Sequence, residues 1–115
     1  MLTLQHPLKG DLVNDGEPEE EERALRGELP WIDDPEDEVN RTTRGLPRDL
    51  VLTKPLRSLF QQCFGPGLNE PEMRPSLMEW RSALEAAAAL LLQCTEGDGC
   101  GSSFYINTAR QCPFC

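Results

Sequence analysis

The chain ends in the stretch Cys94-Thr-Glu-Gly-Asp-Gly-Cys100-Gly-Ser-Ser-Phe-Tyr-Ile-Asn-Thr-Ala-Arg-Gln-Cys112-Pro-Phe-Cys115, which holds four of the five cysteines in two pairs. Between the pairs, Phe-Tyr-Ile has the residue types of a short β-strand. Zn²⁺ takes four thiolates at about 2.3 Å in a tetrahedron, and each cysteine pair can turn the chain around one side of the ion. The stretch therefore predicts a small C-terminal β zinc ribbon, residues 94–115, with Cys94, Cys100, Cys112 and Cys115 as ligands.

The spacing within the two cysteine pairs differs. Two residues separate Cys112 from Cys115, which is typical of a zinc knuckle, whereas five residues separate Cys94 from Cys100. Four thiolates leave no position for water, so we expect a structural Zn²⁺ rather than a catalytic one. The single histidine, His6, is far from the cysteines in the sequence and is not expected to bind the ion. The alternative is a disordered tail whose cysteines are labile or oxidised in pairs.

The net charge of the 115-residue chain is −9, and it is unevenly distributed. Residues 1–40 carry 13 acids and 3 bases, a balance of −10, and residues 41–115 carry 7 acids and 8 bases, a balance of +1. Proteins that bind nucleic acid usually carry a basic surface, and Arg110 is the only base after residue 93. We therefore expect no nucleic-acid partner, and a nucleic-acid-binding zinc ribbon is kept as an alternative function.

The sequence contains no run of about 18 apolar residues and no basic N-terminal segment followed by an apolar core. We therefore expect neither a membrane span nor a signal peptide. The expected location is the cytoplasm. In a reducing compartment clustered cysteines are metal ligands more often than disulfides, which favours the zinc interpretation. Cys63 stands apart from the other cysteines and is expected to be a small buried hydrophobe.

Residues 1–54 are expected to form an acidic, loop-rich segment with one short helix. Pro18 is followed by four glutamates and then by arginines, a charge order that suits a helix dipole, and Gly27 ends the pattern. Residues 28–55 contain four prolines and few periodic apolar positions, so they predict a long irregular loop. Trp31 is expected to fasten this loop to a neighbouring surface or, alternatively, to face a partner. The carboxylates of this loop lack the spacing and the glycine of an EF-hand, so calcium is not expected.

Residues 55–93 predict a pair of helices. In the first, five apolar side chains at helical spacing share one face, and a Gly-Pro-Gly sequence follows them: Leu56, Leu59, Phe60, Cys63 and Phe64. Ser76-Leu-Met-Glu79 is a capping box that begins a second helix, which is expected to run to about residue 92. We expect its core-facing stripe to consist of Trp80, Ala83, Leu84, Ala87 and Leu91. The predicted fold class is mainly α with long irregular loops, plus the small C-terminal β zinc ribbon.

The segment Leu56–Leu84 resembles the closing helices of the C-lobe of eukaryotic-type Ser/Thr protein kinases. In that family Arg-Pro-Ser or Arg-Pro-Thr opens the last helix, as Arg74-Pro75-Ser76 does here, and Glu70-Pro71 stands where Asp-Pro is usual. With its cysteine-rich tail the chain is similar to bacterial kinase-like proteins with an appended zinc ribbon, including the kinase member of tellurite-resistance-associated phosphorylation systems. The resemblance implies a C-terminal fragment whose full-length parent is a protein kinase.

The chain itself lacks the motifs of a kinase active site. It has no glycine-rich loop, no strand lysine, no His-Arg-Asp and no Asp-Phe-Gly, so we expect no enzymatic activity. In the family, the arginine that corresponds to Arg74 pairs with a glutamate of the activation segment, which is absent here. Arg74 is therefore expected to pair with another acid, such as Glu70, or to stay solvated.

The sequence and the resemblance together predict a non-catalytic protein-interaction module. Apolar side chains that so small a core cannot all cover suggest an interface, with Trp31, Phe104 and Phe114 as candidate partner contacts. The resemblance implies a von Willebrand A-type adhesion-site protein or a metal-dependent protein phosphatase as the partner. The alternative is a truncated piece of a Ser/Thr protein kinase whose surface packs on its own missing lobes.

Overall fold

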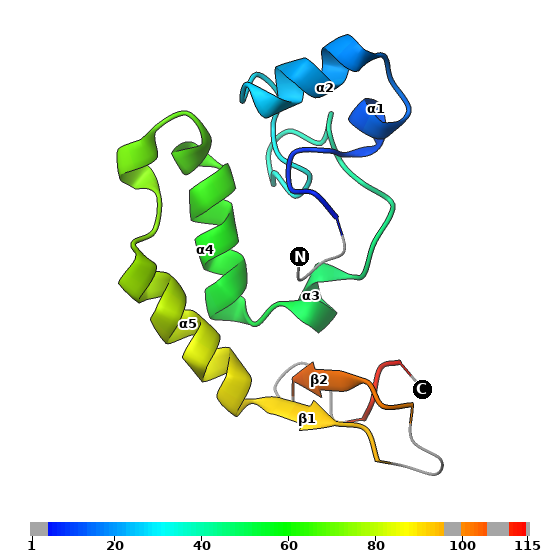
Figure 1. Cartoon of the computed structure of the whole chain (residues 1–115), viewed down its shortest axis with the longest axis vertical. Helices are drawn as coiled ribbons and strands as arrows, with labels where there is room; N and C mark the ends of the chain where they lie inside the picture. The colour runs from blue at the N-terminus through cyan, green and yellow to red at the C-terminus, as the bar shows by residue number, and fades with distance from the viewer. Residues whose placement is uncertain (1–4, 96–99, 106–110, 115) are drawn as a thin grey trace.

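The computed structural model describes residues 5–95, 100–105 and 111–114. Short N-terminal helices are followed by a long loop, a helix pair and a two-stranded antiparallel sheet (Figure 1). The elements are α1 (Asp11–Asn14), α2 (Pro18–Leu25), α3 (Arg48–Val51), α4 (Lys54–Phe64), α5 (Leu77–Ala89), β1 (Leu91–Gln93) and β2 (Ser103–Tyr105). Two 3₁₀ turns, η1 (Pro66–Leu68) and η2 (Pro71–Met73), connect α4 to α5. The chain is thus mainly helical with one small sheet, which confirms the coarse fold class that the sequence predicts.

Both predicted helices of the pair begin at a side-chain cap. The Thr53 hydroxyl accepts a hydrogen bond from the backbone N–H of Leu56, and Pro55 occupies the first turn of α4, where its missing N–H costs nothing. At α5 the Ser76 hydroxyl accepts from the Glu79 N–H at 3.2 Å, and the Glu79 carboxylate accepts from the Ser76 N–H at 2.6 Å. The capping box predicted from the sequence is confirmed.

A small apolar core lies between α4 and α5. Its buried residues are Leu52, Leu56, Ala83 and Ala87, and partly buried side chains pack around them: Val51, Leu59, Phe60, Trp80 and Tyr105. Phe60 and Trp80 meet edge to face, with ring centroids 5.1 Å apart. The two buried alanines on α5 have small side chains, which let α4 approach closely.

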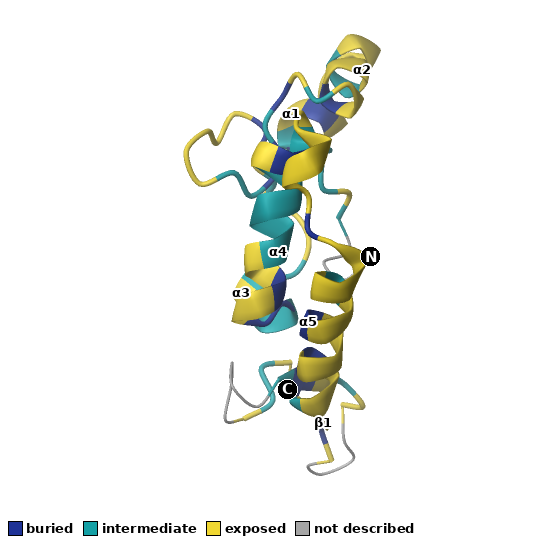
Figure 2. Ribbon diagram, turned by 90° about the vertical axis from the view of Figure 1, so that its left-hand side faces the viewer, coloured by how far each residue is buried: buried dark blue, intermediate teal, exposed yellow. Residues whose placement is uncertain are grey.

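Two features of α5 differ from the prediction. Ala83 and Ala87 of the predicted core-facing stripe are buried, whereas Leu84 and Leu91 of the same stripe are 46% and 47% exposed. The helix ends at Ala89 rather than near residue 92, because Leu91–Gln93 pairs with Ser103–Tyr105 as β1. Figure 2 shows α5 as exposed along most of its length, with only a few buried positions.

The N-terminal segment has a second, smaller core made of Val13, Ala24 and Leu29. The predicted acidic helix is confirmed as α2, whereas α1 was not predicted. Figure 1 shows these helices on one side of α4 and α5 on the other. Trp31 holds the long loop against α4, as the sequence predicted: its ring stacks on Phe64, with the ring centroids 5.5 Å apart. The loop also contains α3, a single turn after Pro47 that the sequence did not predict.

Asn40 holds the N-terminal segment together. Its side chain is fully buried, with an exposed fraction of 0%. Its Oδ1 accepts from the backbone N–H of Gly10 at 3.0 Å, and its Nδ2 donates to the carbonyl oxygens of Leu8 and Pro30 at 2.9 and 3.0 Å. One amide therefore connects three stretches of irregular backbone whose polar groups would otherwise be unsatisfied.

Arg74 is exposed, and its guanidinium donates to backbone carbonyl oxygens. Its Nε donates to the carbonyl oxygen of Gly67 at 2.6 Å and its second terminal nitrogen donates to that of Leu68 at 3.2 Å. This corrects the expected pairing with Glu70: the guanidinium satisfies the carbonyls of η1, which a turn of 3₁₀ helix leaves open. Cys63 is half-buried rather than buried.

Candidate metal centre

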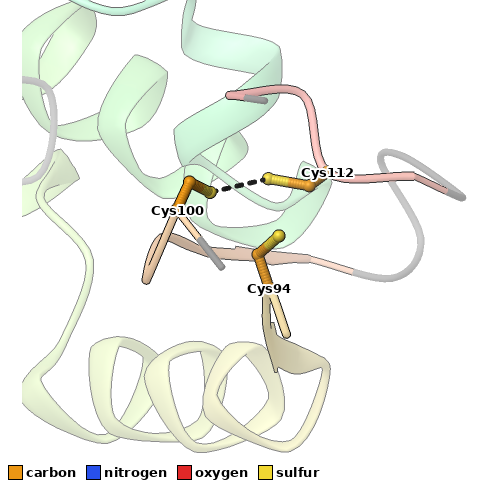
Figure 3. Close-up of side chains that lie close together, drawn as sticks. All are labelled: Cys94, Cys100 and Cys112. Carbon is orange, nitrogen blue, oxygen red and sulfur yellow. Dashed lines mark hydrogen bonds between the residues drawn. The ribbon is translucent and has the colours of Figure 1, made fainter. Parts of the chain in front are cut away.

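Three of the predicted ligands come together at the C-terminal end of the chain. The sulfur atoms of Cys94, Cys100 and Cys112 all lie within 4.8 Å of one another, and those of Cys100 and Cys112 are 3.5 Å apart (Figure 3). Sulfurs that share a tetrahedral Zn²⁺ at 2.3 Å lie about 3.8 Å apart. Three thiols at this separation can hold a metal ion.

The antiparallel sheet explains how Cys94 reaches this position. β1 and β2 pair in the register Leu91–Tyr105, Leu92–Phe104 and Gln93–Ser103. The backbone N–H of Cys94 then donates to the carbonyl oxygen of Ser102 at 2.8 Å, which extends the ladder by one step beyond the strands. Cys94 is therefore held at the end of β1, and its side chain is 7% exposed.

Side-chain alternation gives the two faces of the sheet different neighbours. Residues directly opposite in an antiparallel pair share a face, and successive residues alternate between faces. Phe104, together with Leu92, lines a small cavity beside Cys94 and Cys112. Tyr105 packs against the α4–α5 core. Two successive residues of β2 thus contact different surroundings, the cavity at the cysteines and the helix core.

The two other cysteines of the cluster differ in exposure. Cys100 is exposed and precedes Gly101, which has a φ of +69°, a left-handed conformation that glycine adopts without strain. Cys112 is half-buried and approaches from the C-terminal tail. Figure 3 shows the three side chains converging from separate segments of the chain.

The fourth predicted ligand, Cys115, lies outside the described residues. His6, which was not expected to be a ligand, lies in the N-terminal segment, where its Nδ1 accepts from the backbone N–H of Leu8 at 3.1 Å. Among the residues that the structure describes, no His, Asp or Glu joins the group of three cysteines. Because sulfur ligands suit Zn²⁺, Cu(I) and iron–sulfur clusters, the donor set by itself does not identify the metal.

The candidate partner contacts have unequal exposure. Trp31 is 3% exposed and Phe104 is 8% exposed, so both lie inside the chain. Phe114, beside Cys112, is 36% exposed. The structure therefore differs from the expectation of a surface role for Trp31 and Phe104: Trp31 anchors the long loop on α4, and Phe104 packs beside the cysteines.

Among the described residues, the most exposed large apolar side chains are ones that the sequence did not single out. Leu77 and Met78, in the first turn of α5, are 87% and 66% exposed. Met78 lies on a groove of about 580 Å³ between α4 and α5, which is lined by Pro55, Ser58, Leu59, Met78, Glu79, Ser82, Ala83 and Ala86. The sequence did contain a signal for this exposed surface: two apolar residues follow the capping serine directly, and both lie outside the predicted core-facing stripe.

Over the described part of the chain, no helix has both the length and the apolar character needed to cross a membrane. Comparisons of the sequence with protein-family models, and of the chain with curated proteins and solved structures, find no match. The resemblance to a kinase C-lobe therefore stays a prediction.

Proposed function

We propose that Cys94, Cys100 and Cys112, completed by Cys115, hold a structural Zn²⁺, and that the chain is a zinc-stabilised, non-catalytic protein-interaction module. The observation that carries the metal site is the convergence of three sulfurs within 4.8 Å from three separate segments. Four thiolates would close the coordination sphere, so the ion would act as a cross-link rather than as a Lewis acid.

The small size of the sheet is a reason for the metal. Each strand has three residues, and an isolated two-stranded sheet of this size is at best marginally stable in water. Structural zinc sites contribute about 10–16 kcal/mol of apparent binding free energy, which becomes folding free energy when the site forms only on binding. A bound ion would hold Phe104 in place and, through the same strand, Tyr105 against the helix core.

The interaction surface we propose is the groove between α4 and α5. Its lining is mostly apolar, it opens beside Met78, and Leu77 adds an apolar side chain at the same end. Exposed apolar surface of this kind is typical of sites that accept the apolar face of a partner helix. From the kinase resemblance, we propose a von Willebrand A-type protein or a metal-dependent phosphatase as the partner, in a phosphorylation system of the tellurite-resistance type.

Metal content tests the first half of the proposal. Protein purified without chelator is expected to contain about one zinc per chain by atomic emission, and Cys112→Ser is expected to lose most of it. Cys63→Ser is the matched control, because Cys63 lies on α4, outside the cluster, and it should keep the full zinc content. Less than half an equivalent in the wild type would reject the zinc site.

Co-expression with each candidate partner followed by size exclusion tests the second half. Met78→Asp places a charge in the groove and is expected to abolish co-elution. Val39→Asp is the matched control, because Val39 is similarly exposed, at 55%, and does not line the groove. If Met78→Asp still co-elutes with a partner, the groove is not the binding surface. If the wild-type chain co-elutes with neither candidate partner, both partner classes are rejected.

A further inference from the structure

We infer that Cys100 and Cys112 form an oxidation site at which a hydroperoxide joins the two sulfurs in a disulfide and thereby opens the metal centre. This inference rests on the proposed zinc site and names a chemistry that regulates it. It is argued from the distance between the two sulfurs, the exposure of Cys100, and the backbone hydrogen bond that holds Cys94.

The two sulfurs are already close to bonding distance. They are 3.5 Å apart, and a disulfide requires about 2.05 Å, so an approach of about 1.5 Å is needed. Cys100 and Cys112 lie on different segments, one before β2 and the other in the C-terminal tail, so movement of either segment can close the gap (Figure 3).

The backbone next to Cys100 leaves room for that movement. Among the described residues other than its two chain neighbours, none has an atom within 4 Å of the position that a Cβ on Gly101 would occupy. Cys94, by contrast, is held at the end of β1 by its hydrogen bond to Ser102 and is nearly buried. We therefore assign the disulfide to Cys100 and Cys112 rather than to a pair that includes Cys94.

The exposure of the sulfurs orders the two steps. A peroxide reaches Cys100 first, because Cys100 is exposed and Cys112 is half-buried. The Cys100 thiolate attacks one peroxide oxygen, the O–O bond breaks, and the leaving oxygen departs as hydroxide, or as alkoxide from an organic peroxide. Cys100 is then a sulfenic acid.

In the second step the Cys112 thiolate attacks the sulfur of the sulfenic acid. The S–O bond breaks, hydroxide leaves, and the S–S bond forms. Overall, two thiolates lose two electrons and one hydrogen peroxide gains them, giving one disulfide and two hydroxide ions. The proposed coordination sphere loses two of its four donors, so the site can no longer hold the ion tightly.

The test is a titration of the zinc-loaded chain with hydrogen peroxide, in the presence of a chromophoric chelator that reports released zinc. About one zinc is expected to appear per peroxide consumed, and dithiothreitol with added zinc is expected to restore the site. Cleavage after Glu96 and Arg110 puts Cys94 and Cys100 on different peptides, both separate from the peptide that carries Cys112 and Cys115. Mass spectrometry of the non-reduced digest should show Cys100 joined to Cys112, with fragmentation at Pro113 excluding Cys115.

Two variants sharpen the result. Cys63→Ser should behave as the wild type does, because Cys63 is outside the cluster. Cys112→Ser lacks the resolving thiol, so Cys100 should advance to the sulfinic acid, which dithiothreitol does not reverse.

A disulfide from Cys100 to Cys94 or to Cys115, or zinc release without any disulfide, would overturn the oxidation site. Neither result would argue against the proposed zinc site. A chain that binds no zinc would instead refute the proposed site. The same digest of the metal-free chain would then decide the pairing on its own: Cys100 joined to Cys112 supports the oxidation site, and any other pattern overturns it.

Discussion

Replacing Phe104 by alanine is expected to weaken zinc binding without touching a ligand. Phe104 is 8% exposed, pairs with Leu92 across the sheet, and lines the small cavity beside Cys94 and Cys112. Phe→Ala at buried positions costs about 3–5 kcal/mol, and we take about 3 kcal/mol because this sheet lies at the edge of a small protein.

That loss should appear as metal affinity, because a three-residue strand pair is expected to form only when the metal is bound. At about 1.4 kcal/mol per factor of ten, the dissociation constant for zinc should rise about a hundredfold. Competition with a chelator of known affinity measures it, at a fixed pH because thiolate ligands must be deprotonated.

Leu91→Ala is the control on the same sheet. Leu91 is 47% exposed and pairs with Tyr105 on the opposite face from Phe104, so its truncation should cost about 1 kcal/mol or less and change the affinity less than tenfold. The reasoning is wrong if Phe104→Ala binds zinc within about fivefold of the wild type, or if Leu91→Ala weakens binding as much.

Three further predictions concern stability and are measured by urea unfolding. Asn40→Ala should lower the free energy of unfolding by about 2–4 kcal/mol, because it removes three hydrogen bonds and leaves the Gly10 N–H buried without its acceptor. A loss below about 1 kcal/mol would contradict the role given to the Asn40 amide. Ser76→Ala should cost about 1 kcal/mol through loss of the α5 cap, and an unchanged midpoint would mean that the cap is not needed. Hydrogen bonds from the Thr43 side chain and backbone, and the nearby Arg44, lower the pKa of Asp11. The Asp11 carboxylate therefore contributes its full stabilisation above the ordinary pKa of 3.8, and this contribution is lost as the pH falls through the lowered folded-state pKa. In Asp11→Asn the free energy of unfolding should fall less steeply as the pH is lowered through this range. An equally steep fall in the variant would mean that other carboxylates cause the loss of stability in acid.

The sequence predicted the elements whose signals are local. The apolar spacing of α4, the capping box of α5 and the charge order of α2 each depend on neighbours within one or two helical turns, and all three helices form. The cysteine cluster was predicted for a similar reason, since cysteine spacing is a local pattern, and three of the four cysteines predicted as ligands converge. Cys115 remains a prediction.

The features that the sequence did not reveal depend on contacts between distant segments. Trp31 packs on Phe64, and Asn40 bonds to backbone that lies 10 to 32 positions away, and neither pairing leaves a periodic trace. On α5, Ala83 and Ala87 are buried as the sequence predicted, but leucines and alanines occur on several faces, so the apolar pattern did not show that Leu84 stays exposed. The end of α5 was misplaced because the pairing of Leu91–Gln93 with β2 overrides the helix propensity of the leucines.

The alternation along β2 constrains how this protein can change in length. Phe104 lies beside the cysteines and Tyr105 packs against the helices, so inserting or deleting one residue between Cys100 and Phe104 would exchange the two rings between environments. In proteins built on this plan, the number of residues from Cys100 to the aromatic pair should therefore stay fixed.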